Sequence, residues 1–211
     1  SGANAELDLN GFTLTMSGAF QMDTGSILVG PGTVDVGTDA TFGTGGAITV
    51  PATVAFTVGA FTNVNVGGAD LSLTNAANDF DDGNGTGGFT VASVANLTVV
   101  DTNGTRFNGL STISGNLNVD TTGAAFNDSG EINVSGLATF DVGGNTLTLD
   151  PFDHDFGSID VTAGTATINE LSATVIAAMS VTNTLTLNSG GGITDTGDIS
   201  VTNLATFNAG G

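Results

Sequence analysis

Two acidic stretches are the parts of this 211-residue chain whose residue types could bind a hard cation. Asn78–Asn84 and Asp150–Asp155 each concentrate carboxylates beside turn residues, and carboxylate and carbonyl oxygens are the ligands that Ca²⁺ prefers. Neither stretch follows the spacing of an EF-hand loop. Asp and Asn are also common in solvated turns, because their side chains bond to the nearby backbone. Calcium binding at Asp79–Asp82 or Asp150–Asp155 therefore stays an open alternative, and we predict no dedicated metal site.

The only histidine and the only permanently positive side chain offer little catalytic chemistry. His154 has no cysteine and no second histidine to help it hold a transition metal, so we predict that it lies in a surface turn. Arg106 is the only candidate for the basic residue with which a polysaccharide lyase abstracts a proton. Since carboxylates are abundant, we expect Arg106 to be an ion-pair partner. We predict no catalytic residue and no cofactor.

Glycoside hydrolysis is the second enzymatic alternative, because it needs only two carboxylates at a separation set by the mechanism. The chain has 21 acidic residues, so the mere proximity of two of them would prove nothing. Tryptophan and tyrosine, which commonly form sugar-stacking platforms, are absent. We therefore predict a non-catalytic protein and keep a carbohydrate-active or sugar-binding module as the alternative.

Threonine pairs raise a third alternative, because threonine ladders on flat solenoid faces can bind ice. Thr-x-Thr occurs at Thr13/Thr15, Thr146/Thr148, Thr165/Thr167 and Thr184/Thr186. These copies do not share one constant spacing along the chain, so we expect no regular array. Outward threonine is also favourable on any strand.

The charge balance excludes whole classes of partner. One arginine and no lysine stand against the acidic residues, which gives a formal charge of −20. Such a chain cannot neutralise nucleic-acid phosphates and is repelled by anionic membrane surfaces. The apolar runs are short, so we expect no membrane insertion and see no signal peptide; we interpret the chain as a mature product or a segment of a longer one. Divalent cations are the expected ionic partners.

Strand signals recur along the whole chain. Short runs of alternating apolar and polar residues, separated by Gly, Asn, Asp or Thr, begin about seven residues apart. Examples are Leu7–Leu9, Thr13–Met16, Ser26–Val29, Ala47–Val50, Asn63–Val66, Leu71–Leu73, Asn96–Val100, Leu117–Val119, Thr146–Leu149, Ser158–Val161 and Thr184–Leu187. Three such steps make about 20 residues, which is the size of one coil of a β-solenoid.

Repeated motifs support this coil length. A nine-residue frame with a β-branched residue at its start and Ala-Thr-Phe at its end occurs at Val34–Phe42, Ile132–Phe140 and Ile199–Phe207. The intervals between its copies are near multiples of about 20 residues. No cysteine is available for disulfides, so a continuous ladder of strand hydrogen bonds would have to stabilise the chain.

Phenylalanine spacing supports the same coil. Phe42, Phe61 and Phe80 are evenly spaced, and Phe107 and Phe126 repeat the same interval, so we predict that each set stacks inside successive coils. The gap between Phe80 and Phe107 is longer than this interval, which indicates an inserted loop at 83–88. We predict one all-β domain over 1–211, a right-handed parallel β-helix of roughly ten coils, with Asn and Gly at corners that need positive φ.

These residues resemble a known family. Leu7–Thr15, the Ala-Thr-Phe frames and Gly192–Val201 are similar to the degenerate repeats of filamentous-haemagglutinin-like bacterial surface proteins, within the broader pectin-lyase-like β-helix group. The resemblance implies secretion to the cell surface and an adhesive or stalk role. We therefore predict a structural, extracellular segment of a bacterial surface, adhesin-stalk or filament protein.

The ends of the solenoid suggest its partner. A β-helix exposes unpaired strand edges at its first and last coils, and no amphipathic helix is present to cover them. We predict end-to-end continuation, with further coils or subunits bonded to Leu7–Leu9 and Leu204–Phe207. A head-to-tail contact that does not close into a ring makes a filament.

Overall fold

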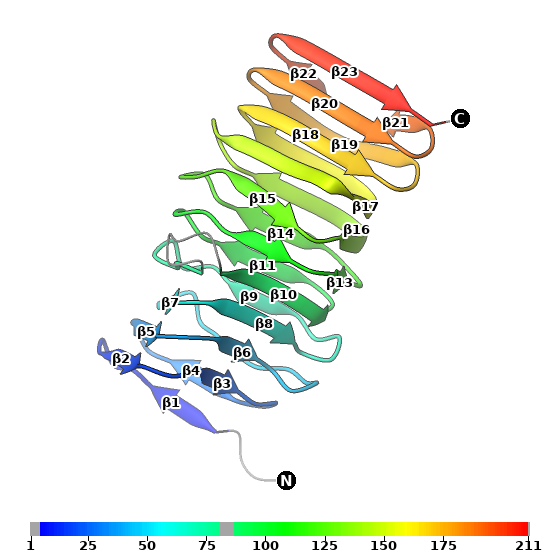
Figure 1. Cartoon of the computed structure of the whole chain (residues 1–211). Helices are drawn as coiled ribbons and strands as arrows, with labels where there is room; N and C mark the ends of the chain where they lie inside the picture. Colours follow the sequence, from blue (N-terminus) through cyan, green and yellow to red (C-terminus); the bar gives the residue numbers. More distant parts are fainter. Residues whose placement is uncertain (1–4, 81–86, 211) are drawn as a thin grey trace.

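The computed structural model describes residues 5–80 and 87–210, with the backbone alone described at 151 and 152. Figure 1 shows the coils stacked along one axis, from β1 (Glu6–Asp8) at one end to β23 (Leu204–Ala209) at the other. All strand pairs among these residues are parallel. The nearer strands run from left to right as the chain climbs, so the solenoid is right-handed (Figure 1). The predicted β-helix is confirmed. The described elements include no helix long and apolar enough to span a membrane.

Ten strands, one from each coil, form a continuous face that we call the long face. They are β3 (Phe20–Met22), β6 (Ala40–Phe42), β8 (Phe61–Asn65), β10 (Gly88–Ser93), β12 (Arg106–Asn108), β15 (Phe126–Ser129), β17 (Thr146–Ala163), β18 (Thr165–Glu170), β20 (Thr184–Ser189) and β23. Backbone hydrogen bonds between these strands join each coil to the next, which is how a chain without disulfides is held together.

The other sides of the coils change along the axis. The N-terminal coils pair β1 with β4 (Ile27–Val29), and β2 (Thr13–Met16) with β5 (Gly32–Val36) and β7 (Val54–Val58). Later coils build a second face, which we call the acidic face, from β9 (Leu71–Leu73), β11 (Leu97–Val100), β14 (Leu117–Asp120), β16 (Ile132–Asp141), the end of β17, β19 (Thr174–Val181) and β22 (Ile199–Val201). The short β13 (Ser111–Ile113) and β21 (Ile193–Asp195) lie at the corner between the faces.

Strand registers measure the coil length. Phe20 pairs with Ala40 and Ala166 pairs with Leu185, so one coil takes about 20 residues, as the sequence predicts. Phe61 pairs with Gly88, a distinctly longer step, so this coil carries the extra length that the sequence indicates. Of the predicted loop at 83–88, residues 83–86 lie outside the described residues, and Gly88 already belongs to β10.

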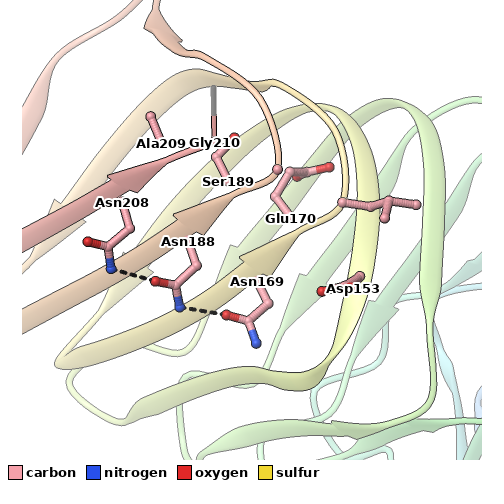
Figure 2. A pocket seen from close by; sticks show the side chains of 10 residues that line it. Asp153, Asn169, Glu170, Asn188, Ser189, Asn208, Ala209 and Gly210 are labelled. Atoms are coloured by element: carbon pink, nitrogen blue, oxygen red, sulfur yellow. Dashed lines mark hydrogen bonds between the residues drawn. The ribbon is translucent and has the colours of Figure 1, made fainter.

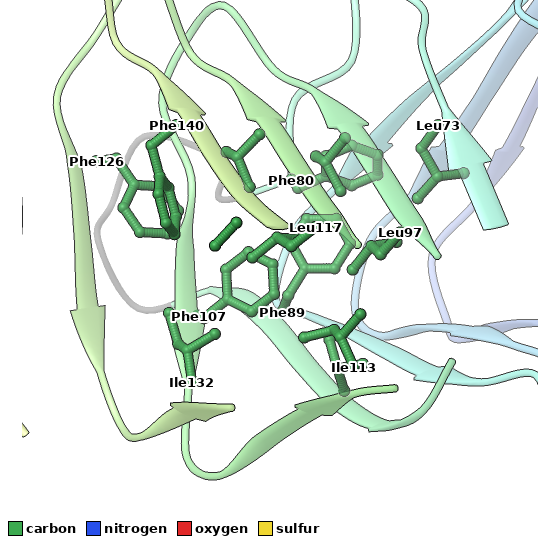
Figure 3. Close-up of a cluster of buried hydrophobic side chains, with 14 of the residues drawn as sticks. Leu73, Phe80, Phe89, Leu97, Phe107, Ile113, Leu117, Phe126, Ile132 and Phe140 are labelled. Carbon is green, nitrogen blue, oxygen red and sulfur yellow. The ribbon is translucent and has the colours of Figure 1, made fainter. Parts of the chain in front are cut away.

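Alternation along the strands fills the interior with Val, Leu, Ile, Ala and Phe side chains. Figure 3 shows the aromatic part of this core between Phe80 and Phe140. Eight rings form one continuous ladder, with neighbouring centroids 4.8–6.5 Å apart: Phe42, Phe56, Phe80, Phe89, Phe107, Phe126, Phe140 and Phe156. The predicted contact of Phe107 with Phe126 is confirmed, at 5.8 Å.

The predicted ladder of Phe42, Phe61 and Phe80 is wrong at its middle member. Phe61 is 41% exposed, whereas Phe56 is fully buried and contacts the rings of both Phe42 and Phe80. The coil here is longer than the Phe spacing suggests, because Phe42 pairs with Val64 and not with Phe61. Phe61 stands an odd number of positions before Val64, which turns its side chain to the opposite side of the strand.

The nine-residue frame does not mark one stacked position either. Phe42 and Phe207 belong to the long face, whereas Phe140 lies in β16 on the acidic face. The frame is therefore a local unit of two strands joined by a corner, and its copies lie at different corners of the coil. Its recurrence identified a solenoid correctly, but its intervals do not measure whole coils.

The threonine expectation also needs correction. Thr146 pairs with Thr165 and Thr148 with Thr167, and Thr167 pairs in turn with Thr186. Three of the four Thr-x-Thr copies are thus in register on the long face, because successive coils have the same length in this region. The fourth, Thr13/Thr15, lies in β2 on another side.

Asparagine has a different role at the corners from the one predicted. Among the described non-glycine residues only Asn10 has positive φ, at 47°. Asn96 and Asn116 instead accept backbone N–H groups from the next coil, at 2.8 and 2.9 Å. Glycine does occupy positive φ, as at Gly67, where a Cβ atom would lie 2.0 Å from the Gly45 carbonyl oxygen.

Candidate functional site

The described part of the first acidic stretch is structural. Asp79 forms a β-bridge with Thr57, and Asn78 is buried with its Oδ1 atom accepting the backbone N–H of Phe56 at 2.9 Å. Asp81 and Asp82 lie outside the described residues. No three acidic, histidine or cysteine side chains in the described part of the chain are grouped so that they could hold a metal ion.

The second acidic stretch is divided between the two sides of β17. Asp150 accepts a hydrogen bond from the Asn169 amide, and Asp155 accepts one from the Ser172 hydroxyl at 2.9 Å. Asp153 is exposed, whereas His154 beside it is fully buried. These side chains do not converge on one point. The prediction that His154 lies in a surface turn is wrong, because strand alternation directs its side chain inward.

His154 belongs to a buried polar column formed with Asp128 and Glu170. The three residues come from β15, β17 and β18, which are successive strands of the long face. The His154 Nε2 atom lies 3.6 Å from Asp128 Oδ2, and both side chains are fully buried. His154 also pairs in register with Glu170, which is 3% exposed, and its ring stacks on Phe156 with centroids 5.6 Å apart.

Each member of the column accepts a backbone N–H group. His154 Nδ1 accepts from Ile132 at 3.0 Å, Glu170 Oε1 from Phe156 at 2.9 Å, and Asp128 Oδ1 from Asp150 at 3.1 Å. Because Nδ1 is an acceptor, neutral His154 carries its proton on Nε2, facing Asp128. A buried N–H group without a partner would cost about 1–3 kcal/mol, so these side chains stabilise the backbone where it turns.

The same arrangement occurs earlier in the chain. Asp101 Oδ2 accepts the Phe80 N–H at 2.9 Å, as Asn78 does for Phe56. Sequence reasoning missed this use of polar residues, although a signal was present. In β18, alternation places Ala166, Ile168 and Glu170 on the same inward side, so the glutamate stands where an apolar residue is expected.

Burial shifts the protonation of all three side chains towards their neutral forms. Desolvation raises the pKa of Asp128 to about 6 and that of Glu170 to about 8, although the backbone N–H groups that they accept oppose the shift. Desolvation lowers the pKa of His154 to about 4, against the attraction of nearby Glu131, Asp153 and Asp150. Near neutral pH, Glu170 is therefore mostly protonated and His154 is uncharged.

An open groove of about 510 Å³ passes over the end of this column. Its lining includes Asp153, Asn169, Glu170, Asn188 and Asn208. Figure 2 shows the three asparagines in a ladder, in which Asn208 donates to Asn188 and Asn188 donates to Asn169, both at 2.7 Å. Asp128 and His154 do not line the groove. A polymer in it would meet amides, the exposed Asp153 carboxylate and the buried Glu170 carboxyl group, and it could not reach the histidine–aspartate pair. We interpret the column as structural.

Arg106 lies on β12, the strand next to β15, where it pairs in register with Asn127. Its Nε atom donates to the Gly87 carbonyl oxygen at 3.0 Å, and no carboxylate among the described residues is within ion-pair distance of it. The predicted ion pair of Arg106 is therefore not found within 5–80 and 87–210. The arginine ties β12 to the start of the neighbouring coil.

Like charges are stacked on the acidic face. Asp120 pairs in register with Asp141 of the next coil. Thr139, two residues before Asp141 on the same strand, pairs in register with Asp160 of the coil that follows. Raising the ionic strength from about 0.01 to 0.15 M shortens the Debye length from about 30 to 8 Å and should weaken this repulsion. We expect the melting temperature to rise by a few degrees, since about 1 kcal/mol corresponds to roughly 2–4 °C in a chain of this size.

Calcium and magnesium chloride at equal ionic strength provide the matched comparison, followed by circular dichroism during heating. We expect the same rise with both salts. A larger rise with calcium alone would mean that Asp79–Asp82 or Asp150–Asp155 binds it specifically, contrary to our interpretation.

Comparison with known proteins adds one finding to this geometry. A family model described as repeats of unknown function, DUF5649, matches residues 18–84, 94–162 and 163–211. The first two matches each span about three coils, so the family repeat is a block of stacked coils and not a single one. No curated protein and no solved structure matches the chain. The chain is a β-solenoid repeat protein that belongs to the DUF5649 family.

Proposed function

We propose that this solenoid is a structural, non-catalytic segment of an extracellular bacterial surface, stalk or filament protein, continued at its ends by further coils or subunits. The observation that carries the proposal is the apolar surface of the last coil. Ile199 and Phe207 are 40% and 44% exposed, yet Met179 and Leu187, their register partners one coil below, are buried. The two exposed side chains occupy core positions that lack a covering coil.

The first coil has the same character. Leu7 is 41% exposed, whereas its register partner Leu28 is 2% exposed. Burial of such side chains by another coil would be favourable by about 25 cal/mol per Å² of apolar surface. The unpaired strand edge at each end also offers backbone hydrogen bonds to the coil that would bury these side chains. Both features support continuation of the coil stack at either end.

The remaining properties fit a rigid spacer. The stack is held by strand hydrogen bonds and a continuous core, and a high negative charge keeps a long solenoid soluble. The resemblance to filamentous-haemagglutinin-like repeats supports a bacterial cell-surface location. A screen against acidic and neutral polysaccharides tests the non-catalytic part: we expect no turnover, and hydrolysis or elimination of any of them would favour the carbohydrate-active alternative.

Self-association of the isolated chain tests the end faces. We expect the wild-type chain to show a concentration-dependent mass above that of the monomer in light scattering. The double variant Ile199→Asp/Phe207→Asp should reduce this association about tenfold or more, because it places charges on the end face. Leu110→Asp is the matched control, because Leu110 is 58% exposed on the side of the solenoid. A monomeric wild-type chain, or equal association of both variants, would contradict the proposal.

A further inference from the structure

The last four coils carry a regular array of threonines on the outside of the long face. The strands read Thr146-Leu-Thr148-Leu-Asp150, Thr165-Ala-Thr167-Ile-Asn169, Thr184-Leu-Thr186-Leu-Asn188 and Leu204-Ala-Thr206-Phe-Asn208. Their registers align the threonines into two columns, Thr146–Thr165–Thr184 and Thr148–Thr167–Thr186–Thr206. The intervening Leu, Ala and Ile side chains point inward and are buried in the three inner strands.

The array is regular in two directions. Successive strands lie about 4.8 Å apart, and alternate residues on one strand lie about 6.6–6.8 Å apart. No register shift interrupts β18, β20 and β23. These two repeats are close to the repeat distances of the oxygen atoms in planes of hexagonal ice. A β-branched side chain has a restricted χ1 angle, so each threonine presents its methyl and hydroxyl groups in few orientations.

The hydroxyl groups of the array are available to water. Thr165 accepts a hydrogen bond from Asn183 at 3.2 Å, while the described residues supply no side-chain hydrogen-bond partner for the hydroxyls of Thr167, Thr186 and Thr206. The asparagine ladder fixes one border of the array, because Asn208 bonds to Asn188 and Asn188 to Asn169. Figure 2 shows this border along the edge of the three strands.

The charge distribution sets this face apart from the rest of the molecule. The chain has a net charge of −20, yet none of the threonine columns contains an ionisable or long flexible side chain. The outward positions of the acidic face instead hold Asp120, Asp141 and Asp160. Apart from Asp150 at its border, this regularly spaced surface carries no charge and therefore attracts ions and nucleic acids only weakly. It is suited to a partner that is itself a planar, hydrogen-bonding lattice.

We propose that the threonine columns of β17, β18, β20 and β23 form an ice-binding surface. Hydroxyl groups would enter the hydrogen-bond network of the lattice, and the methyl groups between them would hold water in the spaces of the array. The inference goes beyond the proposed structural function and does not depend on it: a solenoid of any role could present this face.

Ice itself is the probe that tests the proposal. We expect the purified chain to shape growing ice crystals, to lower their growth temperature below their melting temperature, and to be enriched in a slowly grown ice phase. The double variant Thr167→Arg/Thr186→Arg should reduce the enrichment about tenfold or more, because two long side chains at the centre hold the flat face away from the lattice.

The matched control is Thr139→Arg/Thr162→Arg, which places the same side chains on the acidic face. Thr139 pairs with Asp160 and Thr162 with Asp141, so both positions lie outside the array. Melting curves establish that both variants are folded. Enrichment retained in this control and lost in the array variant supports the proposal. A wild-type chain excluded from ice like an ordinary protein, or equal enrichment of both variants, overturns it.

Discussion

Replacing Phe107 by alanine should destabilise the solenoid by about 3–5 kcal/mol, the largest effect that we expect from a single substitution. The Phe107 ring is fully buried and lies between Phe89 at 5.5 Å and Phe126 at 5.8 Å, so its removal interrupts the aromatic ladder. The cost combines the lost transfer of the ring from water with the cavity that remains, since stacked coils cannot close around it. Urea unfolding followed by circular dichroism measures the change.

Phe61→Ala is the control for this prediction. Phe61 lies on the same face but is 41% exposed, so its removal should change the free energy of unfolding by much less. Because a stacked repeat protein can unfold in parts, the unfolding curves of the two variants should be compared over the whole urea range, from the start of the transition to its completion. Equal destabilisation by Phe61→Ala and Phe107→Ala would contradict the inward and outward assignment of the rings.

The difference between Phe56 and Phe61 shows where sequence reasoning succeeds and fails. A regular spacing of Phe is a sound indication of the coil, and it identified the contact between Phe107 and Phe126. It failed at Phe61 because coil length varies: Phe42 pairs with Val64, and the odd offset between Phe61 and Val64 reverses the direction of the side chain. Alternation within a strand is thus a better guide to burial than spacing between coils.

Strands were easier to predict than the polar residues inside them. Most predicted strands are present, although the segment Ala47–Val50 contributes only an isolated bridge through Thr49. His154 and Glu170 were not recognised as core residues, because their buried roles depend on backbone N–H groups one coil away. These N–H partners can be identified only when the register between neighbouring coils is known, and the sequence alone does not give that register. The threonine array was not predicted for the same reason.

The pH dependence of stability should report directly on Glu170. Its carboxyl group has a pKa of about 8 in the folded chain, whereas the ordinary pKa of a glutamate is 4.5. Between these values the folded chain keeps the proton while the unfolded chain has lost it. The stabilisation is therefore complete below pH 4.5 and is lost as the pH rises through 8. The stability that Asp128 contributes is likewise lost as the pH rises to about 6. The stability that His154 contributes increases instead, as the pH rises from about 4 to 6.5.

Glu170→Gln isolates this contribution, because glutamine keeps an oxygen acceptor for the Phe156 N–H and does not ionise. Below pH 4.5, wild type and variant should have similar stability. Above pH 8 the variant should be more stable by roughly 2–5 kcal/mol, since each unit of pKa shift corresponds to about 1.4 kcal/mol. The effect should grow steadily between pH 4.5 and 8, and in the upper part of this range, above about pH 6.5, Asp128 and His154 no longer titrate. Urea unfolding across pH 4 to 9 measures it.

Glu6→Gln separates this effect from general charge repulsion. It removes one carboxyl group from an exposed position of the first strand without touching the core. All forms of this acidic chain should lose some stability as the pH rises, because more carboxylates repel each other. Only the difference between Glu170→Gln and Glu6→Gln belongs to the buried carboxyl group. If the two variants follow the same curve up to pH 9, Glu170 is not held protonated by its burial, and the polar column is accommodated by water instead.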